Sequence, residues 1–282
     1  MYIAQVITNG ILLGSVYALL GLGMTLIFGI VKQTNLAHGV FIVLGAYLSS
    51  VLAPVLGIDP IFTLLLTVPL MFLFGFVLQY FLIGKAMQKG SEPALLVTFG
   101  LSIILQDVML LIFTADAQHI TTSYSVANFD IFGLKVSVLN VVLFCISLVT
   151  IGALWLFLNK TYTGRAIRAT SDNPEAASLA GVSVRKIYAI AMGIAMASAA
   201  VAGLCVGMKW TFYASSGGSY LLIAFVVVVI GGLGSVPGTL IAGLLFGLAQ
   251  VIGGANYGLL ISYVILLIVL VVKPQGILGK KV

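Results

Sequence analysis

Charged side chains are scarce in this chain of 282 residues: only 7% are Asp, Glu, Lys or Arg, whereas 61% are hydrophobic. A soluble domain carries about 25% charged residues, which it needs to cover its surface. The mean hydropathy of +1.24 points the same way. The composition therefore excludes a soluble globular protein, and most of the surface must face lipid or neighbouring helices.

Residues with ligand or nucleophile chemistry are also few. The two cysteines, Cys145 and Cys205, lie inside apolar stretches, which favours buried free thiols over a disulfide or a metal site. The two histidines, His38 and His119, are far apart, and no His-Glu-x-x-His or Gly-x-Ser-x-Gly motif occurs. The glycine-rich segment 231–238 contains no lysine and is not an ATP-binding loop. We therefore expect no cofactor, no metal and no ATP hydrolysis by the chain itself.

Long apolar runs fill most of the chain. A bilayer-spanning helix needs about 20 apolar residues, and the runs are continuous rather than alternating, which excludes a membrane barrel. The runs cover approximately residues 4–31, 36–53, 60–84, 94–114, 136–158, 188–208, 220–233, 238–253 and 257–272. They predict an all-α, polytopic helical bundle of about eight or nine membrane segments, built as a single domain over residues 1–282.

The seventh and eighth runs need a separate interpretation. The run 220–233 is too short to span alone, and Gly-Gly-Leu-Gly-Ser-Val-Pro-Gly (231–238) separates it from the next. The pair within 220–253 is either a tight helical hairpin or a broken, re-entrant pair buried in protein. Glycines at small-xxx-small spacing predict close helix packing, within the chain or at a dimer face. These glycines are Gly10 with Gly14 and Gly243 with Gly247.

The basic residues fall almost entirely on one side of the membrane if each run crosses once. One side receives Lys32, Lys85, Lys89, Lys160, Arg165, Arg168, Arg185, Lys186, Lys273, Lys280 and Lys281. The other side receives only Lys135 and Lys209, with Asp59, Asp116 and Asp130. The positive-inside rule makes the first side cytoplasmic, which places the N-terminus outside and the C-terminus in the cytoplasm. The net charge of +6 is thereby assigned to membrane loops and not to nucleic-acid binding.

The longest polar segment, 159–187, predicts a short helix between two spans. Asn173 or Asp172 suits the N-cap, Pro174 the first helical position and Gly181 the position after the last turn. The helix would have about two turns, and its alanines would let a partner surface approach closely. The alternative is an ordinary solvated basic loop. The candidate residues of this segment are Gly164, Arg165, Arg168, Asp172, Pro174, Glu175, Ala176, Ala177 and Gly181.

Four further motifs, in the same order along the chain, resemble one transporter family. They are Asn-Gly-Ile-Leu-Leu-Gly-Ser-Val-Tyr-Ala-Leu (9–19), Asn-Leu-Ala-His-Gly (35–39), Val-Ile-Gly-Gly-Leu-Gly-Ser-Val-Pro-Gly (229–238) and Lys-Pro-Gln-Gly-Ile-Leu-Gly (273–279). Together with the polar segment they resemble the branched-chain amino acid permeases of ABC importers, in their LivH-like branch. One departure is Ala224, which stands where members of that family often carry a lysine. The resemblance therefore indicates the class of transporter more strongly than the substrate.

The resemblance implies a transport subunit of the bacterial inner membrane that is not an enzyme. Two ABC ATPase subunits would dock on the short helix of segment 159–187 and hydrolyse ATP. A second, distinct permease subunit would complete the pathway, and an external solute-binding protein would deliver the ligand. The implied substrates are the branched-chain amino acids leucine, isoleucine and valine, with urea or short amides as the alternative.

Polar residues inside the apolar runs are candidates for the translocation path. Gln106 and Asp107 lie midway along the fourth run, where a carboxylate costs about 2.5–3.5 kcal/mol and should face the protein interior or a wet cavity. Asp107 is either part of the path or a buried structural hydrogen-bonding group. Asn35 and His38 either line the path or cap the second run. The ends of two half-helices near 229–240 would offer backbone groups that bind the charged ends of a zwitterionic amino acid. The candidates there are Gly231, Gly232 and Ser235.

Two other classes of membrane protein stay open. A membrane-embedded lipid or isoprenoid transferase would need carboxylates or histidines clustered at one membrane face, whereas Asp107 is isolated. A self-contained channel or ion-coupled carrier would work without ATPase partners. Co-purification distinguishes them, because only the importer subunit should bring ATPase subunits with it.

Overall fold

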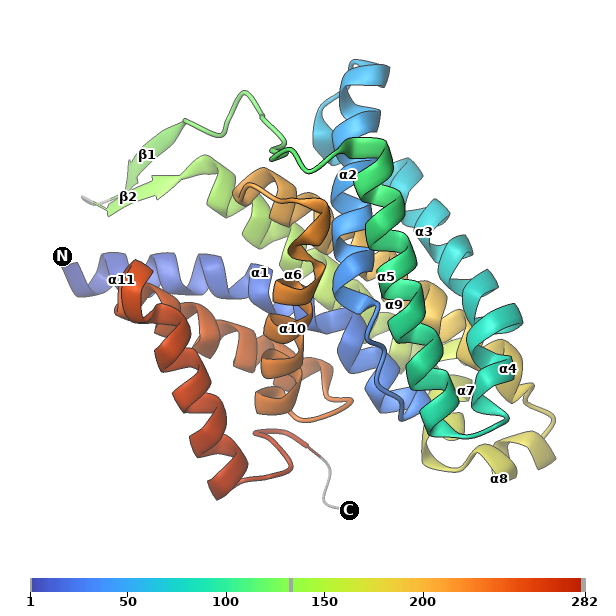
Figure 1. Ribbon diagram of the computed structural model, residues 1–282. Coiled ribbons are helices and arrows are strands. Elements are labelled where there is room, and N and C mark those ends of the chain that lie inside the picture. Colours follow the sequence, from blue (N-terminus) through green and yellow to red (C-terminus); the bar gives the residue numbers. More distant parts are fainter. Residues whose placement is uncertain (1, 132–133, 280–282) are drawn as a thin grey trace.

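The chain folds into a bundle of long helices with almost no strand (Figure 1). The computed structural model describes residues 2–131 and 134–279, so Lys280 and Lys281 of the charge prediction lie outside the described residues. In chain order the elements are α1 (Tyr2–Val31), α2 (His38–Leu56), η1 (Pro60–Thr63), α3 (Leu64–Leu78), η2 (Gln79–Ile83), α4 (Gly84–Met87), α5 (Ser91–Phe113), β1 (Asn128–Ile131), β2 (Leu134–Ser137), α6 (Val138–Lys160), α7 (Tyr162–Asp172), α8 (Pro174–Leu179), α9 (Val184–Lys209), η3 (Ala214–Ser216), α10 (Gly217–Gly231) and α11 (Val236–Val272). The predicted all-α, polytopic class is confirmed.

Eight helical segments of the described chain are long and apolar enough to cross a bilayer, and a further one, Asn256–Val272, is shorter. Each predicted apolar run coincides with one of these segments. The last two runs form one element, α11, which is broken at Gly254, where φ is 61° and ψ is −163°. Glycine suits this break because it has no Cβ to clash in that backbone conformation.

The seventh run forms a longer helix than its apolar residues predict. With η3, α10 makes an apolar segment of 18 residues, Ala214–Gly231, which is long enough to cross. The prediction that this run is too short to span alone is therefore wrong, because the preceding Ser-Gly-Gly-Ser residues continue the helix. α10 and the first half of α11 form a hairpin through residues 232–235, where Gly232 and Gly234 have φ of 100° and 82°.

The centre of the bundle is formed by α1 and α9. In each of these two helices, 83% of the apolar 18-residue stretch is buried inside the bundle. The same share is 22% for the span that contains α3 and 17% for α5. Small residues make this central position possible, because they let backbones approach closely in a membrane. A Cβ added at Gly203 on α9 would lie only 2.2 Å from the carbonyl oxygen of Ile42 on α2. α3 and α5 therefore form the outside of the bundle.

The glycines at small-xxx-small spacing pack α1 against α11. A Cβ added at Gly247 would lie 2.3 Å from the Cα of Gly14, and one added at Gly243 would lie 2.5 Å from the Cα of Ala18. These contacts join two helices of the same chain. Of the two interpretations of the glycine spacing, packing within the chain is the one that the structure contains.

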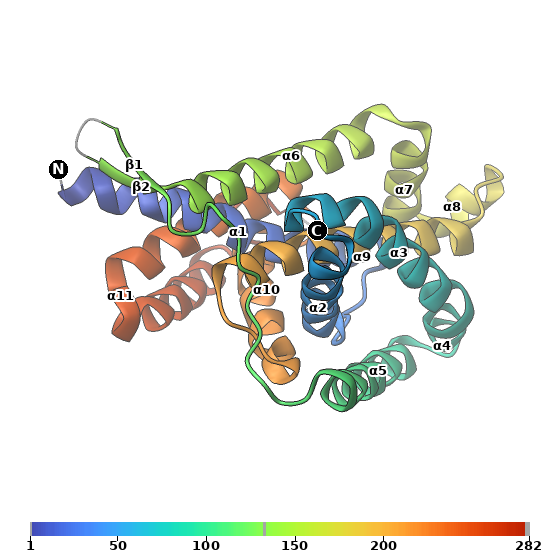
Figure 2. The same cartoon turned by 90° about the horizontal axis from the view of Figure 1, so that it is seen from above.

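The two ends of the bundle carry different structures (Figures 1 and 2). The β1–β2 hairpin and the start of α1 lie together at one end, where Gln5 donates to the carbonyl oxygen of Lys135 at 2.7 Å. The hairpin, antiparallel with Asn128 opposite Ser137, was not predicted from the sequence. α4, α7 and α8 lie at the opposite end. We refer to these as the hairpin end and the α8 end.

Candidate functional site

The polar segment 159–187 contains two helices, where the sequence predicted one. α7 is capped by Thr161, whose hydroxyl accepts from the Gly164 backbone N–H at 2.9 Å. The turn between α6 and α7 is tight enough to need glycine, since a Cβ at Gly164 would lie 2.4 Å from the Phe157 carbonyl oxygen. The signal for α7 that sequence reasoning missed is this cap, followed by buried residues spaced along one helical face. Those residues are Ala166, Ile167 and Thr170.

Hydrogen bonds fasten α7 to the rest of the bundle. The Ser171 hydroxyl donates to the carbonyl oxygen of Gly29, near the end of α1. Arg168 donates through Nη1 to the Leu158 carbonyl oxygen at 2.7 Å and to Asn159 Oδ1 at 2.6 Å, both at the end of α6. α7 is therefore tied to two membrane helices at once. Arg165, in contrast, points out beside Tyr162, with its guanidinium carbon 6.0 Å from the ring centroid.

The short helix predicted between 172 and 181 is α8. Its N-cap is Asn173, whose side-chain oxygen accepts from the Ala176 backbone N–H at 3.0 Å, while Asp172 is the last residue of α7. Pro174 occupies the first position of the helix. Gly181 follows with a φ of 84°, and its N–H donates to the Ser178 carbonyl oxygen at 3.0 Å. These interactions satisfy both ends of a helix that is too short to be stable alone.

α8 projects from the bundle, and only one of its residues is buried. Ala177 is only 5% exposed, whereas Pro174, Glu175, Ala176 and Ser178 are exposed. Leu179, at the end of the helix, is 91% exposed. The helix therefore offers a small, mostly uncharged surface with one apolar side chain to anything that meets the α8 end.

Asn35 and His38 lie buried where α1 passes into α2. Asn35 is 3% exposed; its Oδ1 accepts from the Ala37 N–H at 3.0 Å, and its Nδ2 lies 3.6 Å from the Met192 sulfur on α9. His38 is fully buried with Nε2 3.1 Å from the Leu20 carbonyl oxygen, and its Nδ1 has no partner among the described residues. In this conformation both side chains face protein.

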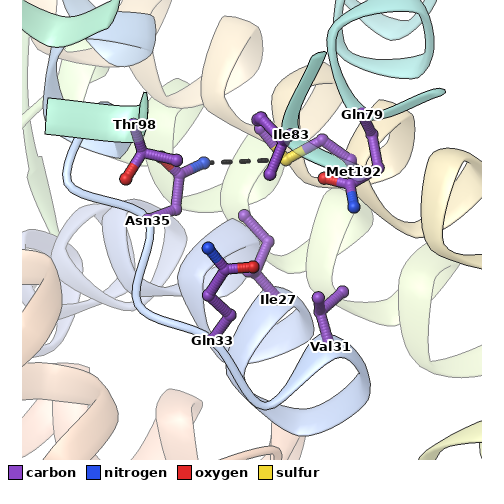
Figure 3. A pocket seen from close by; sticks show the side chains of 8 residues that line it. All are labelled: Ile27, Val31, Gln33, Asn35, Gln79, Ile83, Thr98 and Met192. Atoms are coloured by element: carbon purple, nitrogen blue, oxygen red, sulfur yellow. Dashed lines mark hydrogen bonds between the residues drawn. The ribbon is translucent and has the colours of Figure 1, made fainter. Parts of the chain in front are cut away.

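A small polar cavity adjoins Asn35 (Figure 3). Its volume is about 10 Å³, which is room for a single water molecule. Its lining residues come from α1, the linker after it, η2, α5 and α9, and are Ile27, Val31, Gln33, Asn35, Gln79, Ile83, Thr98 and Met192. The Gln33 amide nitrogen is buried without a partner among the described residues. Sequence reasoning missed Gln33, Gln79 and Thr98, although each interrupts or borders an apolar run.

Gln106 and Asp107 lie away from that cavity, on the outside of the bundle. Asp107 is exposed and Gln106 is half-buried. Asp107 therefore does not face the interior of this chain, and its role in the translocation path stays a prediction. The physical reason why the sequence did not show this orientation is that α5 is only weakly amphipathic, so its sequence gives little indication of which face meets the bundle. Nearby, a Cβ added at Gly100 would meet nothing within 4 Å.

Gly231, Gly232 and Ser235 form the turn between α10 and α11, which the end of the chain covers. The Ile277 and Leu278 N–H groups donate to the carbonyl oxygens of Ile230 at 2.8 Å and Gly231 at 3.1 Å. The Ser235 hydroxyl caps α11 by accepting from the N–H of its third residue. The two sequence motifs at 229–238 and 273–279 are thus one structural unit. Its helix-end groups have partners inside the chain, and a role in the translocation path remains a prediction.

Ala224 is fully buried on α10, in a small apolar cluster with Met24 of α1 and Val228. A lysine at this position would enter the packing between α10 and α1. The position at which this chain has Ala224 and family members often have lysine therefore lies in the interior of the bundle.

The described residues thus form a bundle of membrane-length helices from which a short capped helix projects at one end. Residues 6–272 match the family described as "Branched-chain amino acid transport system / permease component", and the chain belongs to this family. The resemblance found in the sequence motifs is thereby confirmed.

Relatives of the chain extend over its whole length. The high-affinity branched-chain amino acid transport system permease protein BraD of Pseudomonas aeruginosa is 29% identical, with 98% of this chain and 95% of the relative covered. The permease protein LivH of Escherichia coli K12 is 29% identical, over 99% of this chain and 96% of the relative. The probable LivH permease of Methanocaldococcus jannaschii is 26% identical, over 98% and 92%. No solved structure matches the chain.

Proposed function

We propose that the chain is the permease subunit of an ATP-binding cassette importer that moves leucine, isoleucine and valine into the cytoplasm. The observation that carries the proposal is α8, a capped helix that projects from one end of a bundle belonging to a permease family. The chain has no ATP-binding loop of its own, so the energy must come from separate subunits. The names of the relatives support branched-chain amino acids as the substrates.

The contacts of α7 and α8 support a route by which ATPase motion reaches the membrane helices. A pair of ATPase subunits would dock on the α8 of each permease subunit. Their closure would displace α8, and α7 would follow because it is continuous with α8 through Asn173. The Ser171 hydroxyl would pass the displacement to Gly29 on α1. The linker that carries Gln33 and Asn35 begins just beyond, so the buried polar cavity is the first intramembrane site on this route.

The outward face of α5 is proposed as the contact with a second, distinct permease subunit. A carboxylate that faces lipid at mid-span costs about 2.5–3.5 kcal/mol, so Asp107 needs a polar environment that its own chain does not supply. The open space above Gly100 would let a partner helix approach closely. A path between the two subunits would place Asp107 and Gln106 at its wall.

The orientation proposed from the charges puts the α8 end in the cytoplasm and the N-terminus outside. The hairpin end would then face an external solute-binding protein. Lys209 lies at the hairpin end and donates to Asn140 Oδ1 at 2.5 Å, which gives this isolated cation a partner.

Co-purification and uptake test the proposal together. Ala176→Arg adds a charge to the exposed face of α8 and should abolish both ATPase association and ATP-driven uptake. Ala169→Arg is the matched control, because Ala169 is exposed on the neighbouring α7 and its substitution should leave association intact. Uptake of labelled leucine, isoleucine and valine should exceed uptake of urea and acetamide. Robust uptake by the chain alone in liposomes would contradict the importer.

A further inference from the structure

An open cavity lies at the α8 end of the bundle. It sits where α3 passes through η2 into α4 and where α9 begins. Its volume is about 340 Å³, large enough for a small polar headgroup. The lining residues are Gln79, Gly84, Met87, Gln88, Val184, Arg185 and Tyr188. Neither the proposed coupling route nor the α5 face uses this cavity.

Arg185 is fixed at this cavity with most of its hydrogen-bonding capacity unused. Its Nη2 donates to the Tyr80 carbonyl oxygen at 2.8 Å, and its guanidinium carbon lies 4.0 Å from the centroid of the Tyr80 ring. Tyr80 belongs to η2, a π-helical turn, and such turns are frequent at functional sites. Arg185 makes no ion pair with a described residue, and none of the lining residues is acidic. A positioned guanidinium with free N–H groups matches the geometry of a phosphate.

An aromatic row leads from the cavity along α3 toward the middle of the membrane span. Phe72, Phe76 and Tyr80 stack at successive turns, with ring centroids 6.5 Å and 5.9 Å apart. All three are half-buried, and the neighbouring Leu73 and Phe81 are 62% and 57% exposed. The row therefore offers a continuous apolar surface that starts at the cationic cavity and enters the hydrocarbon region.

We infer that this cavity binds an anionic phospholipid from the leaflet on the α8 side. The Arg185 guanidinium holds the phosphate, Gln88 and Tyr188 lie beside the headgroup, and an acyl chain lies along the aromatic row. A basic pocket between membrane helices at the interface is the kind of site that recognises anionic headgroups. A free phosphate has the same headgroup chemistry but makes no use of the aromatic row. The inference does not rest on the proposed transport function.

A lipid in this place would hold together two parts of the bundle. Gln79 lines both this cavity and the buried polar cavity beside Asn35, and its amide nitrogen lies 3.2 Å from the Met87 sulfur. The bound headgroup would contact η2 and α4 on one side and the start of α9 on the other. The lipid is thus expected to stabilise the junction of α3 and α9.

Native mass spectrometry of the purified full-length chain in detergent tests the inference. Phosphatidylglycerol should form an adduct of one lipid per chain, and phosphatidylcholine of the same acyl composition should bind more weakly. Arg185→Gln should weaken phosphatidylglycerol binding about tenfold. Lys186→Gln is the matched control, because it removes the same charge from an exposed neighbour that does not line the cavity. It should change binding by no more than about twofold.

A second variant tests whether the space of the cavity is needed for binding while the Arg185 charge is kept. Gln88→Trp fills the mouth of the cavity and leaves Arg185 in place, and it should also weaken phosphatidylglycerol binding. Equal losses in Arg185→Gln and Lys186→Gln, or tight binding in both Arg185→Gln and Gln88→Trp, would overturn the site. Displacement of the lipid by millimolar inorganic phosphate would show that free phosphate is the ligand and would overturn the lipid. No ATPase subunit is present in this measurement, so its outcome is separate from that of the transport tests.

Discussion

Ser171→Ala should uncouple ATP hydrolysis from transport without preventing the ATPase subunits from binding. The substitution removes the hydroxyl that links α7 to the Gly29 carbonyl oxygen on α1 and leaves α8 unchanged. A neutral hydrogen bond of this kind contributes about 0.5–1.5 kcal/mol. If this contact passes on the displacement of α8, its loss should lower coupled uptake roughly two- to tenfold at an unchanged rate of ATP hydrolysis.

The assay is uptake of labelled leucine by proteoliposomes of the whole importer, with ATP hydrolysis measured in the same sample. Thr170→Val is the control, because among the described residues the Thr170 hydroxyl bonds within α7, to the Ala166 carbonyl oxygen at 2.8 Å. This control should retain uptake. The reasoning is refuted if Ser171→Ala transports at the wild-type rate, or if both variants lose uptake equally.

Three further outcomes follow from particular contacts. Gly247→Ala should force α1 and α11 apart and cost about 2 kcal/mol, or roughly 4–8 °C in Tm, whereas Gly100→Ala, whose Cβ meets nothing, should leave Tm unchanged or raise it. Asp107→Asn should keep uptake within about twofold because the amide still hydrogen-bonds in a polar interface, while Asp107→Leu should lose association with the second permease subunit. Burial and the hydrogen bond to Asp59 raise the pKa of Tyr124 from 10.0 to about 12. The stabilisation that Tyr124 provides should therefore be complete below pH 10 and lost as the pH rises toward 12, which ultraviolet titration of wild type against Tyr124→Phe would measure.

The membrane segments could be predicted because length and hydropathy are enough to define a span. The cap residues Asn173 and Gly181 likewise indicated α8, since their chemistry is local. The central position of α9 also leaves a trace in the sequence, because its many alanines and glycines suit a helix that is surrounded by others.

The features that the sequence did not predict depend on contacts between distant parts of the chain. The outward direction of Asp107 is set by which face of α5 packs against the bundle, and the weakly amphipathic pattern of α5 gives little indication of this face. The cavity beside Asn35 joins residues from five segments, and its polar members Gln33, Gln79 and Thr98 are isolated in the sequence. The pairing of motif 229–238 with 273–279 is a backbone contact and is independent of side-chain type, apart from the glycines that permit it.

The packing of α1 against α11 has a consequence for biosynthesis. α1 is made long before α11, which its glycine face contacts at Gly14 and Gly247, so that face stays uncovered until α11 has been synthesised. A truncated chain would expose that face in the bilayer and offer it to membrane proteases. The α1–α11 contact can therefore form only late in synthesis, although α1 and α11 lie side by side in the folded bundle.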